Sequence, residues 1–378
     1  MAELPGFGLY VHWPFCQAKC PYCDFNSHVS TQIDHAEWAR AYEMEIERLG
    51  EETGERRLNS VFFGGGTPSL MDPQTVERVL SSARRVWSFA NDIEITLEAN
   101  PTSVEADRFK SFFAAGVNRV SVGLQALNDA DLKQLGRLHT ADEGRRAFDI
   151  ARAVFPRSSF DLIYARQDQS LSDWEAELAE AIAFASAHLS LYQLTIEPGT
   201  AFGDRQKRGL LRGLPPDDLA ADMYEMTQQM TLDAGLPAYE TSNHAQAGDE
   251  SKHNLIYWRG GDWAAIGPGG HGRLTLDGSR YATETPRSPK EWLGAALNGE
   301  NPENRTVLSQ EEINEEAVMM GLRLAEGVEA ALIPQFEEKI NNINGLAESN
   351  LIELHDGRIM LTAAGRPLLN AVLRELLV

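Results

Sequence analysis

Three cysteines, Cys16, Cys20 and Cys23, lie in one short stretch near the N-terminus with the spacing CxxxCxxC, and the chain has no others. Soft thiolate ligands favour zinc, copper or iron–sulfur clusters. A structural zinc site normally takes four protein ligands, and a disulfide framework normally uses an even number of cysteines. Three thiolates on one loop therefore favour a [4Fe-4S] cluster, with three irons held by the protein and the fourth open to a small chelating molecule.

Two other interpretations of the cysteines stay open. Free cysteines are often buried core residues, so the three could be structural. The other interpretation is a zinc or redox half-site, with His12 or His28 adding a ligand to zinc. Against it, no further cysteine exists to complete a zinc site or to resolve a redox pair.

Short apolar runs alternate with longer amphipathic stretches over the first half of the chain. The runs predict strands at 7–12, 60–63, 93–97, 119–122, 160–164 and 189–196. Helical periodicity predicts helices at 35–50, 73–88, 104–115, in the stretch that reaches 155, and at 171–186. Strand–helix units in alternation predict a parallel α/β fold, which right-handed crossovers curl into a barrel or part of one. The chemistry of such folds lies at the carboxyl ends of the strands.

A glycine-rich loop follows the second predicted strand directly. Gly65 and Gly66 precede Thr67 within the run Gly64–Pro68. Glycines at this place let the backbone come close to a ligand, and exposed N–H groups would receive a carboxylate. A flexible connecting turn is the plainer interpretation of the same residues.

Four polar side chains, predicted at successive strand ends, form a second group. They are Glu98, Gln125, Arg137 and Asp161. Glu98 and Asp161 would accept hydrogen bonds from a ribose or an ammonium group, and the planar fork of Arg137 would pair with a carboxylate. Each alone would be an ordinary strand-end residue, but together we expect them to ring one face of the barrel.

The C-terminal part of the chain has a different pattern. Residues 284–306 are rich in Pro, Asn and Glu and are predicted to be a linker. Helices are predicted at 311–326 and 363–377, and a hairpin with an Asp356-Gly357 turn at 351–362. These elements predict a small winged-helix-like α+β domain, and because it lacks a concentrated basic face we expect a lid or a protein-contact domain. The predicted domains are 1–235 for the barrel, 236–305 for a motif segment with the linker, and 306–378 for the C-terminal domain.

Composition argues against several classes of function. The chain has 378 residues, of which 43% are hydrophobic and 24% charged, and its formal net charge is −22. Nucleic-acid binding is not expected, because phosphate neutralisation needs an excess of Lys and Arg. No apolar run approaches the roughly 20 residues of a membrane span, and the N-terminus lacks a signal-peptide pattern. Unpaired thiols suit a reducing compartment, so we expect a cytoplasmic protein.

The motifs together resemble the family of oxygen-independent coproporphyrinogen III oxidases and their relatives, within the radical S-adenosylmethionine (SAM) superfamily. The resemblance covers nearly the whole chain and rests on Cys16–Cys23, Gly64–Pro68, Glu98–Pro101, Ser121–Gln125, Gly136–His139 and Asp161–Tyr164. It implies a partial (β/α)6 radical-SAM barrel that is open on one side. It also implies a [4Fe-4S] cluster on Cys16, Cys20 and Cys23, whose open iron chelates SAM and whose electron releases a 5′-deoxyadenosyl radical.

The resemblance implies which residues line the SAM site. They are Tyr10, Tyr22, Gly65, Gly66, Thr67, Glu98, Gln125, Arg137 and Asp161. The glycine loop stands where the superfamily bonds the methionyl amino group of SAM, with Thr67-Pro68 in place of a glutamate. Further along, Gly267 and Gly269 would permit close approach of the adenosyl group.

Two features indicate the branch of HemW-type haem chaperones. The true oxidases have a fourth cysteine two residues after the third, where this chain has Phe25, and a longer segment ahead of the cluster. The run His253–Trp258 has the HNxxYW pattern of the chaperone branch. That branch implies haem binding and the transfer of haem to acceptor haemoproteins. The alternative is an oxidase that decarboxylates coproporphyrinogen III to protoporphyrinogen IX in porphyrin biosynthesis.

The HNxxYW run supplies groups that suit haem. His253 would ligate the iron through an imidazole nitrogen. The flat faces of Tyr257 and Trp258 would pack on the porphyrin, and Lys252 and Arg259 would meet the propionates. The other interpretation is a structural loop whose histidine bonds to the backbone.

Overall fold

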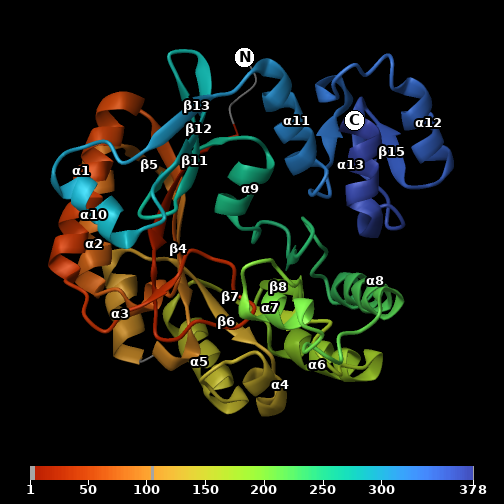
Figure 1. The fold of residues 1–378 in the computed structure, drawn as a ribbon, viewed down its shortest axis with the longest axis horizontal. Helices are drawn as coiled ribbons and strands as arrows, with labels where there is room; N and C mark the ends of the chain where they lie inside the picture. The colour runs from red at the N-terminus through yellow and green to blue at the C-terminus, as the bar shows by residue number, and fades with distance from the viewer. Residues whose placement is uncertain (1–4, 104–105, 378) are drawn as a thin grey trace.

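The computed structural model describes residues 5–103 and 106–377, and its main feature is one large sheet. Within the described residues the sheet has eleven strands in the order β13-β12-β11-β10-β1-β4-β5-β6-β7-β8-β9. The run from β10 to β8 is parallel throughout and curls into a partial barrel (Figure 1). Its strands are β10 (Asp262–Ile266), β1 (Phe7–Trp13), β4 (Arg57–Gly65), β5 (Ser88–Ala99), β6 (Arg119–Gln125), β7 (Arg157–Tyr164) and β8 (His188–Gln193).

The six parallel strands that the sequence predicts are confirmed as β1 and β4 to β8. Antiparallel strands at both edges were not predicted. They are β9 (Asn243–Ala245), β11 (His271–Leu276), β12 (Ser279–Glu284) and β13 (Asn304–Val307). Because β10 pairs with β1, the strands between residues 262 and 307 build one whole side of the sheet, while β9 lies at the opposite edge.

Helices cover the outer, convex face of the sheet (Figure 1). They are α1 (His35–Thr53), α2 (Pro73–Val86), α3 (Ala106–Ala115), α5 (Ala141–Val154), α6 (Leu171–Phe184) and α8 (Asp217–Asp233). Alternate strand residues such as Leu9, Val61 and Leu97 pack under them without exposure to solvent. Their neighbours point the other way, and on β5 these are Glu94 and Thr96, both buried. Parallel strands are usually apolar on both faces, so this polar inner face marks the concave side as functional.

Two predicted elements differ in their limits. The helical stretch that reaches residue 155 is broken into α4 (Asp129–Gln134) and α5, and Gly136, with φ 69°, supplies the left-handed turn that ends α4. The predicted helix 104–115 is present from Ala106, and residues 104 and 105 lie outside the described part of the chain.

The prediction of a linker at 284–306 is wrong. The segment contains α10 (Pro289–Leu297) and most of β13. Trp292 is fully buried, and its ring stacks on Trp38 of α1 with a centroid distance of 5.5 Å and packs on Tyr42 at 5.2 Å. Trp292 and Ala296 are the buried residues of α10, four positions apart on one face, so the Pro- and Asn-rich composition concealed an amphipathic helix.

The C-terminal domain has its own core, which includes Val318, Ile343 and Ile359. Its elements are α11 (Gln310–Gly321), β14 (Val328–Glu329), α12 (Ile340–Glu348), β15 (Ile352–His355), β16 (Arg358–Leu361) and α13 (Leu369–Leu377). The predicted hairpin is confirmed, with positive φ at both Asp356 and Gly357 as a type I′ turn requires. None of the helices in the described ranges is long and apolar enough to cross a membrane.

The packing of α10 predicts that Trp292→Ala lowers the free energy of unfolding by about 3–5 kcal/mol, because it removes a fully buried indole. Urea denaturation followed by circular dichroism measures this. Lys290→Ala, an exposed site on the same helix, is the control and should change stability by less than about 0.5 kcal/mol. Equal effects of the two substitutions would contradict the packing of α10 against α1.

Candidate functional site

The cysteine loop lies at the carboxyl end of β1 and is held there by its neighbours. Cys16 belongs to β2 (Phe15–Cys16), which pairs with β3 (His28–Val29), and all three cysteines are half-buried. The ring of His12 bonds the Asn26 carbonyl through Nε2 at 2.9 Å. The Asn26 amide in turn donates to the carbonyls of Pro268 and Arg287, both at 2.9 Å. Segments far apart in sequence therefore fix the loop.

The glycine loop at the end of β4 presses against this cysteine loop. A side chain at Gly65 would lie 2.6 Å from the His12 ring, and one at Gly66 would lie 2.7 Å from the Phe15 carbonyl oxygen. The glycines thus permit a close approach, but to the chain itself. The N–H groups of Gly66 and Thr67 donate to Trp13 and Phe15, so these two are not free to receive a carboxylate, as the sequence had suggested.

Two side chains reach the cysteine sulfurs directly. The Thr67 hydroxyl donates to Cys16 Sγ at 3.4 Å, and Arg137 Nη1 donates to Cys20 Sγ at 3.5 Å. The prediction that Arg137 lies at the end of a strand is wrong. It lies in the loop between α4 and α5. It reaches the strand ends because its Nη2 donates to the Gly123 carbonyl of β6 at 2.9 Å.

Besides Glu94, two carboxylates line the inner face of the sheet, toward the carboxyl ends of the strands. Glu98 lies near the end of β5, and Asp161 lies on β7, where it accepts a hydrogen bond from Ser121 Oγ at 2.9 Å. Burial first, and then the nearby Asp161, raise the pKa of Glu98 to about 8. Burial also raises the pKa of Asp161, against the hydrogen bond from Ser121. Glu98 is therefore mostly protonated at pH 7 and is able to donate as well as accept.

The remaining predicted SAM residues surround the same space. Gln125 ends β6 with φ 72°, a left-handed conformation that few residues adopt. Tyr10 lies on β1, and its hydroxyl forms a hydrogen bond of 3.1 Å with Nδ1 of His12. Tyr22 belongs to the cysteine loop, and its ring packs on Phe202. Burial raises the pKa of both tyrosines, so they stay neutral.

The residues present fit an iron–sulfur cluster with a bound small molecule. Ser27 Oγ and Arg137 Nε are buried and find no hydrogen-bond partner among the described residues. Ser27 lies close enough to Cys16 and Cys23 to lower the pKa of both thiols, although burial has the larger, opposite effect. Within the described ranges no three Cys, His, Asp or Glu side chains converge as one ion requires. A cluster asks for less convergence, since each thiolate binds a different iron.

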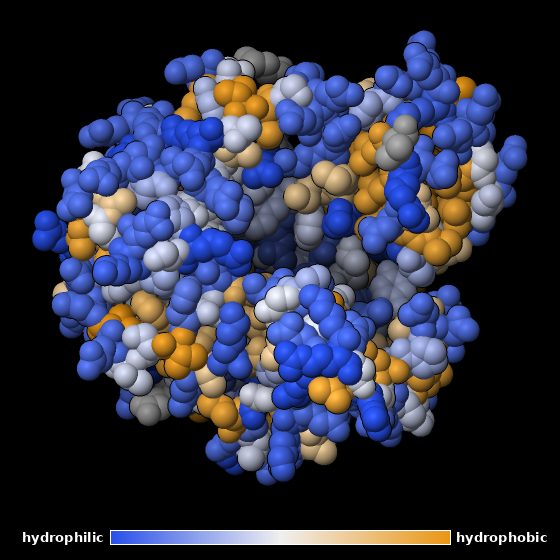
Figure 2. Space-filling view, viewed as in Figure 1, coloured by the Kyte–Doolittle hydropathy of each residue, from blue (hydrophilic) through white to orange (hydrophobic). Residues whose placement is uncertain are grey.

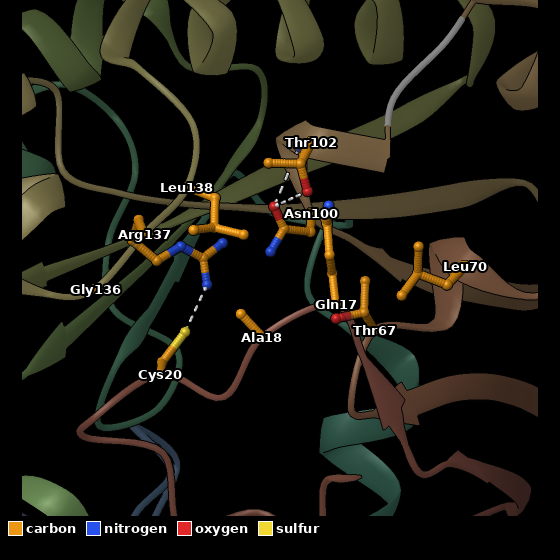
Figure 3. A pocket seen from close by; sticks show the side chains of 10 residues that line it. All are labelled: Gln17, Ala18, Cys20, Thr67, Leu70, Asn100, Thr102, Gly136, Arg137 and Leu138. Carbon is orange, nitrogen blue, oxygen red and sulfur yellow. Dashed lines mark hydrogen bonds between the residues drawn. The ribbon is translucent and has the colours of Figure 1, made fainter. Parts of the chain in front are cut away.

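A small pocket of about 20 Å³ opens between the cysteine loop and the loop after β5 (Figure 3). Figure 3 shows Cys20, Thr67 and Arg137 lining it together with Gln17 and Asn100. The sequence did not predict Gln17 or Ser27 as site residues, and it named Ser121 only as the start of the run Ser121–Gln125. For Ser121 a signal existed, since it stands two residues before Gly123 on a strand whose inner face is polar.

His253 does not join this group at the cysteine loop. It lies on α9 (Lys252–Trp258), which packs on β4, β10 and β1 on the concave side of the sheet (Figure 1). The side chain is 1% exposed, Nδ1 bonds Ser60 Oγ at 2.7 Å, and Nε2 bonds the Tyr257 hydroxyl. Burial lowers its pKa to about 3. Both ring nitrogens are thus occupied within the protein.

The flanking residues of the HNxxYW run are also in use. Lys252 forms an ion pair with Asp92, and Arg259 forms one with Glu326 of the C-terminal domain. Their contact with haem propionates stays a prediction. The glycines at 267 and 269 approach the chain itself, because added side chains would meet the His12 carbonyl and Asn26.

Comparison with family models and with known proteins assigns the chain to one family. A model of the radical SAM superfamily matches residues 10–181, and one of the HemN C-terminal domain matches residues 308–368. A protein of Escherichia coli K12 named Heme chaperone HemW is 41% identical over 78% of this chain and 77% of its own. A Bos taurus protein named radical S-adenosyl methionine domain-containing protein 1, mitochondrial, is 37% identical over 98% of this chain and 87% of its own.

One solved structure shares the whole fold. It is coproporphyrinogen III oxidase (HemN) from Escherichia coli, described as a radical SAM enzyme, with a TM-score of 0.81 and 22% identity. The match covers 99% of this chain and 91% of that one. At this identity the likeness shows the fold and nothing about the substrate.

The cysteine loop predicts that anaerobic reconstitution gives about four irons and four sulfides per chain, with an electron paramagnetic resonance signal that changes when SAM is added. Cys20→Ala should abolish iron binding, because only two thiolates would remain. Lys19→Ala, an exposed neighbour on the same loop, should load iron as the parent does. A tetrahedral zinc spectrum from the reconstituted chain would reject the cluster.

The raised pKa of Glu98 predicts a pH-dependent effect of Glu98→Gln. A carboxyl whose pKa is higher in the folded state binds more protons when folded, so its contribution to stability falls as pH rises from about 4.5 to about 8. The amide does not titrate. The melting temperature of Glu98→Gln relative to the parent, in matched cofactor states, should therefore rise between pH 5 and pH 9. A constant difference over that range would show that the pKa of Glu98 is ordinary.

Proposed function

Because the chain belongs to the radical SAM superfamily and, within it, to the family of the Heme chaperone HemW proteins, we propose that it is a haem chaperone. It binds a [4Fe-4S] cluster and SAM in the barrel, takes up haem, and passes the haem to acceptor haemoproteins. The supporting observation is the cysteine loop at the mouth of a polar barrel: its three thiols are half-buried, Cys16 is bonded by Thr67, and Cys20 is bonded by Arg137.

The proposal gives each group at the mouth a role. Cys16, Cys20 and Cys23 hold the cluster, which when bound with SAM supplies one-electron chemistry. Arg137, fixed by the Gly123 carbonyl, keeps a buried Nε–H available for an anionic group beside Cys20. Glu98, neutral near pH 7, and Asp161 offer hydrogen bonds of both kinds to a ribose or an ammonium group.

Two observations favour a chaperone over the alternative, an oxygen-independent coproporphyrinogen III oxidase. The relatives at about 41% identity are named haem chaperones, whereas the structural neighbour named an oxidase shares only 22% of its residues. Phe25 stands where the resembled oxidases have a further cysteine, and its side chain is 56% exposed. The thiol that distinguishes the oxidases is therefore absent from the loop.

We propose His253 as the haem contact on the basis of the HNxxYW run. Its burial sets the condition for that contact: the bond to Tyr257 must break before Nε2 can reach an iron. Because α9 has only seven residues, about two turns, and lies beside the hollow of the molecule that Figure 2 shows, a shift of this short helix would be enough to expose the ring.

The acceptor and the compartment belong to the same proposal. A reduced thiol loop fits the cytoplasm, and a protein with a net charge of −22 is a poor ligand for nucleic acid. Relatives from Bos taurus and Mus musculus are named mitochondrial, so a reducing organelle interior is the alternative location.

One assay on the reconstituted protein tests the function. The chain should bind one haem per monomer, with a Soret band, and lose it to an apo-haemoprotein in a spectroscopic transfer assay. The reduced protein with SAM and coproporphyrinogen III should form no protoporphyrinogen IX. Steady formation of that product, above a Cys20→Ala control, would instead establish the oxidase.

His253→Ala tests the haem contact in the same assay. It should lower haem affinity at least about tenfold, or alter the Soret band, because an imidazole is lost from the iron or its surroundings. His244→Ala is the matched control, since His244 is equally buried and lies outside the HNxxYW run. Unchanged haem binding in His253→Ala, with a lowered melting temperature, would show that the run is a structural loop.

A further inference from the structure

A second pocket, of about 160 Å³, opens at the amino ends of β6, β7 and β8, the opposite end of the strands from the cysteine loop. Arg119, Arg157 and His188 line it, and each is the first residue of one of these strands. Arg152 of α5 and Asp249 complete its charged lining. We call it the lower pocket. None of the proposed roles in cluster, SAM or haem binding uses it.

The lower pocket has more positive than negative side chains in its lining. Arg119 and Arg157 are direct partners across β6 and β7, and like charges at such positions repel. Both depend on one buried carboxylate: Glu94 lies 2.6 Å from Arg157 and 3.9 Å from Arg119. Among the lining residues three guanidinium groups face a single carboxylate, that of Asp249. In a chain of net charge −22 this is a local reversal of sign.

The existing contacts of the three arginines leave donors for a ligand. Arg157 makes four hydrogen bonds, to the Glu94 carboxylate, to the carboxylate and carbonyl of Asp249, and to the Glu250 carbonyl. Arg119 is 3% exposed and makes two, to Thr96 at 3.5 Å and to Ser159 at 3.2 Å, while its Nε lies 3.9 Å from Glu94, beyond hydrogen-bond distance. Arg152 lies at the rim, half-exposed; it pairs with the exposed Asp149, donates to the Phe184 carbonyl at 3.5 Å and lies over the Phe184 ring. The ion pair is exposed and therefore worth little, and the bond to Phe184 is long, so Arg152 can turn to a bound anion at small cost.

His188 adds a neutral donor to the lining. Its side chain is 4% exposed, and burial with the nearby Arg119 lowers its pKa well below the ordinary value. Tyr239 accepts a hydrogen bond from the Ser251 N–H and bonds His188 Nε2 at 3.0 Å. If the tyrosine proton points to Nε2, the ring carries its own proton on Nδ1. That Nδ1 is buried and has no partner within the described part of the chain.

We propose that the lower pocket binds a small oxyanion of the phosphate class, either free or as the terminal group of a larger molecule. Guanidinium forks, a neutral N–H and the hydroxyls of Ser158 and Ser186 are the donors that tetrahedral oxyanions take in proteins. The pocket volume is large enough for a ligand the size of several water molecules and too small for a porphyrin.

The anion site is connected to α9 through one carboxylate. Glu94 accepts from Arg157 on the pocket side and from the N–H groups of Lys252 and His253 on the other. An anion that draws Arg157 toward the lower pocket weakens its bond to Glu94. Occupancy of the pocket and the packing of α9 are therefore linked.

Calorimetric titration of the full chain with inorganic phosphate tests the site, with sodium chloride at matched ionic strength as the blank. Saturable binding and a rise in melting temperature are expected. Arg152→Gln and His188→Gln should each weaken binding on the order of tenfold. Arg145→Gln is the matched control, because it removes from the same helix a guanidinium whose ion pairs, with Glu180 and Asp142, lie outside the lower pocket. It should bind phosphate as the parent does.

Glycerol phosphate and succinate serve as further probes. Binding of glycerol phosphate at least as tight as that of phosphate would assign the terminal group of a larger ligand, and weaker binding would assign the free ion. Succinate binding without phosphate binding would overturn the phosphate assignment. Equal phosphate affinity in Arg152→Gln, Arg145→Gln and the parent, or no effect beyond sodium chloride, would overturn the site itself.

Discussion

The carboxylate of Glu94, buried on the barrel's inner face, makes the interaction on which much of this structure depends. An isolated charge in that position would be costly, and its compensation sets the surroundings. Arg157 supplies an ion pair at 2.6 Å, and Ser251, Lys252 and His253 direct donors at it from the start of α9. One side chain therefore joins the parallel strands to the helix that fills their concave side.

The same constraint explains why the barrel can be polar inside without losing its form. By the strand register its inner side chains form layers: Thr96 is level with Arg119, Glu98 is level with Ser121 and Ser159, and Asp161 comes next along β7. Hydrogen bonds link neighbouring layers, as between Arg119 and Ser159 and between Ser121 and Asp161. Satisfied networks of this kind rigidify a core and hold ionisable groups where their pKa values depart from the ordinary.

Sequence reasoning reached the parallel strands and the residues at their ends because apolar runs and local motifs carry that information. It misplaced Arg137, whose approach to β6 depends on where the α4–α5 loop folds back, and periodicity does not encode that. It missed the β11–β12 hairpin although Asp277-Gly278 carries the same turn signal as Asp356-Gly357, with positive φ at both positions. It took 284–306 for a linker because the residues that bury Trp292 come from α1, over two hundred positions earlier. No local sequence pattern predicts that His253 is buried.

The place of β1 in the sheet has a consequence for synthesis. The strand pairs with β4 on one side but with β10, some 250 residues later, on the other. Contacts between such distant residues form late, because a long chain must be ordered first. The loop with Cys16, Cys20 and Cys23 thus leaves the ribosome more than two hundred residues before its anchors at Pro268 and Arg287. During that interval the three thiols lie on an unanchored segment, so the fold itself delays completion of their site until the anchoring segment has been made.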